Sequence, residues 1–125
     1  MRRTAARLVA EASTRVEGLD PGQLAAELRV GAAVLIDVRE ADELHEQGRI
    51  PGSVWVPRGT LEFRADPTNP RHHPGLEPNR RVIVHSTSGE RSALAAATLD
   101  DMGYHRVAHL EGGLTAWKQA GQPAV

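Results

Sequence analysis

Short apolar runs alternate along the chain with segments of helical periodicity. The apolar runs predict buried strands at 33–36, 54–56, 82–84 and 107–108, with a short extended piece around Val16. Apolar spacing and cap residues predict helices over the first fifteen residues and over 21–30, 40–47, 92–102 and 113–120. Because strands and helices alternate, we expect an α/β fold in which helices cover both faces of one open, mostly parallel sheet of about five strands.

The stretch 61–78 lacks a periodic pattern. Leu61 to Phe63 fits a single helical turn, and the prolines at 67, 70, 74 and 78 then indicate an irregular loop. A length of 125 residues suits one hydrophobic core. We therefore divide the chain into an N-terminal helix at 1–14 and a single domain at 15–125.

Composition and charge argue against several classes of function. The 16 acidic and 15 basic residues nearly cancel, so there is no basic stripe of the kind that binds nucleic acid or an anionic membrane surface. No segment approaches the roughly 18 apolar residues of a membrane span. We therefore expect a cytoplasmic protein with neither a nucleic acid nor a membrane as partner. The chain has no cysteine, which removes disulfides, thiolate metal sites and thiol nucleophiles.

The candidate chemistry lies in the segment that follows the predicted strand at 82–84. It comprises His85, Ser86, Thr87, Ser88, Gly89, Glu90, Arg91 and Ser92, and it leads directly into a helix. Ligands bind at the carboxyl ends of strands in such sheets. The N–H groups of a curled loop and the dipole of the helix can together bind an anion, and Arg91 offers further donors. The same residues also suit an ordinary turn whose hydroxyls cap the helix, so both interpretations stay open.

Three motifs in order resemble the rhodanese-like family over nearly the whole chain. The family's active loop follows the pattern C-x-x-G-x-R, often with Ser next, and Ser86 to Ser92 matches it except at the first position. Leu35 to Arg39 with Glu43, and then Gly48 to Ser53, resemble the opening signature D-V-R-x-x-x-E and G-H-I-P-G-A. Glu111 to Trp117 is similar to the closing G-G-x-x-A-W. The resemblance implies a single-domain rhodanese-like fold.

The resemblance also implies an activity, sulfur transfer. In active members the loop cysteine takes a sulfane sulfur from thiosulfate or another donor, holds it as a persulfide and passes it to cyanide or another thiophilic acceptor, without a metal or other cofactor. Carried over to this chain, Ser86 and Arg91 are the catalytic positions. The substrate-binding positions are Thr87, Ser88, Gly89, Glu90 and Ser92.

Serine at position 86 changes the expected outcome. A hydroxyl forms no stable equivalent of a persulfide, and an alcohol without a base is not ionised as a thiol is. We therefore expect the chain to be inactive in sulfur transfer, whether the replacement of cysteine is natural or engineered. The alternative is a naturally non-catalytic module that binds an anion or a protein partner, motivated by Glu90 and by the loop at 61–78.

Two other enzyme classes are disfavoured. A serine hydrolase needs a base beside Ser86, but His85 should point to the opposite face of its strand, and the G-x-S-x-G pattern is absent. Related phosphatases have one residue more between nucleophile and arginine than the four that separate Ser86 from Arg91.

Further polar and aromatic residues receive structural interpretations. Asp37 and Arg39, with Glu43, are expected to form a buried or half-buried ion pair rather than a catalytic cluster. Adjacent His72 and His73 lack the spacing of a metal site. Arg58 could add a second positive charge to the loop pocket, with Arg64 further out, or both could be solvated. Trp55 and Trp117 are expected in the core, and close packing before the last helix explains Gly112 and Gly113.

Overall fold

The computed structural model describes residues 1–125 and contains one five-stranded parallel sheet. The strands lie in the order β1-β5-β4-β2-β3, and every neighbouring pair is parallel. Their bounds are β1 Glu17–Leu19, β2 Val34–Asp37, β3 Val54–Trp55, β4 Val82–His85 and β5 Val107–Leu110. This arrangement confirms the α/β fold that the alternating pattern predicted.

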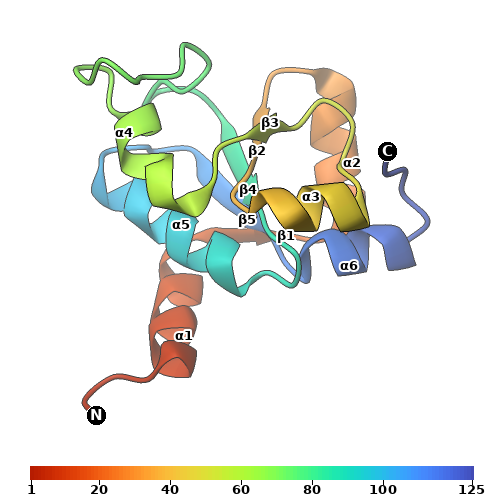
Figure 1. The fold of residues 1–125 in the computed structure, drawn as a ribbon, viewed down its shortest axis with the longest axis horizontal. Coiled ribbons are helices and arrows are strands. Elements are labelled where there is room, and N and C mark those ends of the chain that lie inside the picture. Colours follow the sequence, from red (N-terminus) through yellow and green to blue (C-terminus); the bar gives the residue numbers. More distant parts are fainter.

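Helices cover both faces of the sheet (Figure 1). Their bounds are α1 Ala5–Arg15, α2 Pro21–Val30, α3 Ala41–Gln47, α4 Leu61–Ala65, α5 Glu90–Asp101 and α6 Gly113–Gln119, with a 3-10 turn η1 at Arg58–Thr60. Helices α4 and α5 lie over one face, and α2 and α6 lie over the other. Helix α5 begins two residues earlier than predicted, at Glu90, directly after Gly89. No helix combines the length and apolarity that crossing a bilayer requires.

Side chains of the central strands alternate between two apolar clusters. Val34 and Ile36 face α4 and α5, whereas Leu35 between them faces α2 and α6. Strand β4 repeats the pattern, with Val82 and Val84 on the first side and Ile83 on the second. Both faces of each strand are therefore buried, which is why the sequence shows continuous apolar runs rather than alternation with polar residues.

Helix α1 packs against α5 through small residues. Ala12 contacts a patch formed by Ala93 and Ala97, with Val9 partly buried beside it. Leu8, four residues before Ala12 and therefore on the same side of α1, is 38% exposed. The short alanine side chains allow the two helices to approach closely, so the bulkier Leu8 lies at the margin of the contact.

The two tryptophans differ from each other in burial. Trp117 is 2% exposed and lies in the core, as expected, but the expectation for Trp55 is wrong, since it is 39% exposed. Trp55 belongs to β3, which forms one edge of the sheet, and its indole N–H donates to the carbonyl of Arg39 at 2.9 Å. The ring is therefore held at the surface by its polar end.

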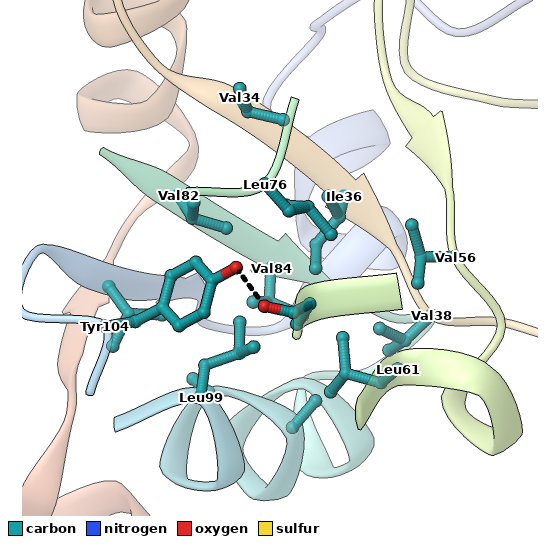
Figure 2. Close-up of a cluster of buried hydrophobic side chains, with 14 residues drawn as sticks. Val34, Ile36, Val38, Val56, Leu61, Leu76, Val82, Val84, Leu99 and Tyr104 are labelled. Carbon is teal, nitrogen blue, oxygen red and sulfur yellow. Dashed lines mark hydrogen bonds between the residues drawn. The ribbon is translucent and has the colours of Figure 1, made fainter. Parts of the chain in front are cut away.

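Tyr104 ties α4 to the larger apolar cluster. Its side chain lies among Val82, Val84 and Leu99, and its hydroxyl donates to the carbonyl of Ala65 at the end of α4, at 2.7 Å (Figure 2). Burial raises the pKa of Tyr104 to about 12, so the hydroxyl remains a donor throughout the physiological range.

We expect Tyr104→Phe to lower the free energy of unfolding by about 1–2 kcal/mol, because it leaves the buried carbonyl of Ala65 without this donor while preserving the ring. Urea denaturation of both proteins measures the difference. An unchanged free energy of unfolding would show that the hydroxyl contributes nothing to the stability of this region.

Candidate active site

The loop from Ser86 to Gly89 curls around the side chain of Ser86 at the carboxyl end of β4. Ser86 is 1% exposed, and its Oγ accepts hydrogen bonds from the backbone N–H groups of Gly89 and Ser92, each at 3.2 Å. Gly89 has φ of +103°, a conformation that a residue with a side chain rarely adopts. The position that matches the family's nucleophile therefore lies where two backbone donors converge. We call the loop from Ser86 to Ser92 the amide cup.

The amide cup is supported from behind by the start of α6. The N–H of Leu114 donates to the carbonyl of Ser86 at 2.9 Å, and the N–H of Thr115 donates to the carbonyl of Thr87 at 3.0 Å. A Cβ atom on Gly113 would lie 2.4 Å from the oxygen of Thr87 and 2.6 Å from that of Ser86. Only glycine permits this approach, which confirms the close packing expected before the last helix.

Arg91 pairs with Glu43 of α3. Its Nη1 lies 2.7 Å from Oε2 of Glu43 and its Nη2 lies 2.5 Å from Oε1, in a two-pronged contact. Thr87 also donates to Oε1 of Glu43, at 2.9 Å. Hydrogen bonding to Arg91, supported by the N–H of Glu40 and by Thr87, lowers the pKa of Glu43 to about 2 despite partial burial. The contact links α3 to the amide cup.

Asp37 and Arg39 form the expected buried ion pair, but without Glu43. Both side chains are fully buried; Nη2 of Arg39 lies 2.7 Å from Oδ2 of Asp37, and its Nε lies 3.0 Å from Oδ1. Nη2 also donates to the carbonyl of Gly48 at 2.8 Å. The grouping of Glu43 with this pair is wrong, because Glu43 on α3 extends to the amide cup instead. Spacing along the chain did not show whether Glu43 would pair with Arg39 or with Arg91.

The structure places no base beside the hydroxyl of Ser86. His85 points to Asp37, with Nε2 at 3.4 Å from Oδ2, and burial lowers its pKa, which favours the neutral ring. His109 lies 3.1 Å from Oγ of Ser92, not from that of Ser86. A serine nucleophile needs a base within hydrogen-bond reach, so the arrangement of a serine hydrolase is not formed.

The remaining candidate residues lie around the rim or away from it. Ser88 and Glu90 are exposed, Thr87 is half-buried, and Ser92 is buried with its hydroxyl donating to the carbonyl of Gly89 at 3.0 Å. The structure does not bring Arg58 to the amide cup. Arg58 donates to Glu62 at 3.0 Å and to Thr98 at 3.3 Å, because η1 directs it toward α5.

The histidine pair in the long loop shapes that loop. A ring nitrogen of His72 lies 2.6 Å from the carbonyl of Leu76, and Nδ1 of His73 accepts the N–H of Gly75 at 2.9 Å. Both rings therefore hold backbone groups within their own loop.

Sequence reasoning missed two residues beside the amide cup, His109 and Glu111. Both line a cavity of about 310 Å³ that also includes Ser88 and Glu90. The signal that could have found them was the position of His109 in an apolar strand, β5, next to β4, the strand that Ser86 follows. Carboxyl ends of neighbouring parallel strands meet at one edge of the sheet.

The sequence matches the model of the rhodanese-like domain family over residues 20–120, so the chain belongs to this family. Among sequence relatives, a sulfurtransferase of Allochromatium vinosum is 34% identical over 92 residues, which cover 74% of this chain and 78% of that protein. In four further relatives, the segment shared with this chain covers only 40% to 63% of the relative's own length.

Solved structures show the same fold over most or all of the chain. RPA3614 of Rhodopseudomonas palustris, a protein of unknown function and possible tyrosine phosphatase, is similar with a TM-score of 0.94 and 38% identity, over 100% of this chain and 96% of that one. The polysulfide-sulfur transferase homodimer of Wolinella succinogenes is similar with a TM-score of 0.77 and 30% identity, over 94% of this chain and 83% of that one.

The contact between Glu43 and Arg91 predicts a pH dependence of stability. The pKa of Glu43 is about 2 in the folded protein, below the ordinary value of 4.5. As the pH falls from 4.5 toward 2, the unfolded chain binds a proton at this carboxyl and the folded protein does not, so the free energy of unfolding decreases. We expect Glu43→Gln to lower the free energy of unfolding by about 1 kcal/mol at neutral pH. The variant should also lose less of this free energy than the unchanged protein as the pH falls.

Chemical denaturation across that pH range measures the effect. Glu46→Gln is a matched control, because Glu46 is an exposed carboxyl on the same helix. It should follow the profile of the unchanged protein. A Glu43→Gln variant whose profile also matches the unchanged protein would contradict the role of the ion pair.

Proposed function

We propose that this chain is a rhodanese-like domain of the thiosulfate sulfurtransferase type that binds a small sulfur-containing anion but does not transfer sulfur, because Ser86 occupies the nucleophile position. The observation that carries the proposal is the environment of Ser86. Two backbone N–H groups converge on its Oγ, no base is within reach, and the chain has no cysteine elsewhere.

The chemistry that Ser86 lacks follows from the atoms involved. With a thiolate at this position, sulfur attacks the outer sulfur of thiosulfate, a new S–S bond forms, and sulfite leaves with the electron pair of the broken bond. Cyanide then attacks the bound sulfur, which yields thiocyanate and restores the thiolate. Converging N–H donors at a helix N-terminus stabilise a thiolate and lower the pKa of the thiol. An alcohol has a far higher pKa, and the same donors do not ionise it without a base.

The remaining residues of the amide cup support its shape. The hydroxyl of Ser92 holds the carbonyl of Gly89, and Arg91 joins the rim to α3 through Glu43. The proposal assigns substrate binding to the backbone N–H groups from Thr87 to Ser92 and positioning of the rim to Arg91. Arg58 has no part in it.

The second candidate is a naturally non-catalytic rhodanese-like module that binds an anion or a protein partner and would not gain activity from a cysteine at position 86. The observation that favours it is the charge around the amide cup, since both terminal nitrogens of Arg91 are engaged by Glu43 while Glu90 lies exposed at the rim. A cup with so little free positive charge would hold a dianion less firmly than one with an unpaired arginine.

The experiment restores the thiol. We expect Ser86→Cys to form thiocyanate from thiosulfate and cyanide at least about a hundredfold faster than the unchanged protein, because a nucleophile contributes far more than this to an enzyme's rate. Mass spectrometry after thiosulfate alone should show one added sulfur atom on Ser86→Cys.

Two variants control for the thiol itself. Ser86→Ala should stay inactive, and Ser88→Cys, which places a thiol at an exposed position two residues away, should stay at the background rate. If Ser86→Cys is folded by circular dichroism but silent in both assays, the sulfurtransferase proposal is wrong and the second candidate replaces it.

A further inference from the structure

A cavity of about 310 Å³ is lined in part by residues 88–90 of the amide cup. Its walls come from three parts of the chain. Helix α1 contributes Val9 and Ser13, the loop contributes Ser88 and Glu90, and the end of β5 with the residue after it contributes His109 and Glu111. Its volume is at the lower end of the range for small-ligand sites, which suits one functional group with a short stem.

The charges that line this cavity are negative. Glu90 and Glu111 are both exposed carboxylates, and the lining contains no lysine or arginine. Arg91, the cation of the loop, is directed away from the cavity by its two contacts with Glu43. The two carboxylates of this lining attract a positive group.

His109 is an independent sign of a ligand. The side chain is only 5% exposed, yet it lines the cavity. Its Nδ1 lies 3.1 Å from Oγ of Ser92, whose proton is donated to the carbonyl of Gly89, so Nδ1 carries the hydrogen of that contact. The other ring nitrogen, Nε2, then has a free lone pair. It has no protein partner and is not sealed in the interior, so it opens onto the cavity.

We propose that this cavity binds a cationic N–H donor, an alkylammonium or guanidinium group, whose hydrogens are accepted by Glu90, Glu111 and Nε2 of His109. Val9 provides an apolar contact for the stem of the ligand. Burial lowers the pKa of His109, which keeps the ring neutral and able to accept. Two of the lining residues belong to α1, which lies outside the matched family region of 20–120, so the site depends on a helix that the family model does not include.

The test is an NMR titration of the whole chain with n-butylammonium, and with n-butanol as the uncharged probe of similar shape. We expect saturable shifts at the His109 ring and at the amides of Glu90 and Glu111 with the ammonium, and none with the alcohol. Thiosulfate, which the proposed function places on the N–H groups of residues 87–92, should leave the His109 ring and the Glu111 amide unchanged. Equal responses to ammonium and alcohol would overturn the proposal.

Charge variants test the carboxylates. We expect Glu90→Gln combined with Glu111→Gln to weaken ammonium binding at least about tenfold, because two charge-assisted hydrogen bonds are lost. Asp42→Asn combined with Glu46→Gln changes the net charge equally at exposed positions on α3 and should leave affinity within about twofold of the unchanged protein. An equal loss of ammonium affinity in both double variants would show that only the net charge of the protein matters. That result would contradict the proposed site.

A separate titration tests whether the cation comes from a protein side chain or from a free amine. A blocked Gly-Lys-Gly peptide that binds at least about tenfold more tightly than n-butylammonium would indicate a lysine side chain of a protein, through added backbone contacts. Equal or weaker binding would indicate a free amine. This titration needs no residue change at position 86, so its outcome is independent of whether Ser86→Cys transfers sulfur.

Discussion

The arrangement of the candidate site depends on the contacts that the buried guanidinium of Arg39 makes. This guanidinium is held by Asp37 at the end of β2 and donates to the carbonyl of Gly48 at the end of α3. A buried charge of this kind is tolerated only when its hydrogens are satisfied, so the end of the strand and the end of the helix must stay together. Helix α3 is thereby held where Glu43 can reach Arg91, and this contact joins α3 to the amide cup.

The amide cup and the neighbouring cavity offer opposite electrostatic surroundings within one small region. Backbone N–H groups converge on Ser86, whereas Glu90, Glu111 and the free nitrogen of His109 line the adjacent space. Such a pair of surfaces suits a ligand set in which an anion or sulfur atom is held by the cup and a cation is held beside it. Ser86 differs from the cysteine of the family's active loop by one atom at the centre of the cup. The supporting contacts from α6 are in place around it.

The order of the motifs indicated the family and the position of the loop from one sequence. It did not predict which side chains pair with one another. Glu43 was grouped with Arg39, four residues away, although it pairs with Arg91, 48 residues away. Arg58 follows an edge strand near the site, yet η1 turns its side chain toward Thr98. Both arginines are long and flexible, and local sequence carries no information on which distant acceptor each will find.

By itself, the sequence determined the parallel α/β architecture, the position of the loop and the absence of a thiol. These properties depend on local apolar patterns, on glycine positions and on residue identity, all of which are written along the chain. Only the tertiary structure decided that Trp55 lies at an exposed edge, that Arg91 is neutralised by Glu43, and that His109 opens onto an acidic cavity under α1. Burial, charge pairing and cavities arise between segments far apart in sequence, because they depend on how strands order themselves within the sheet.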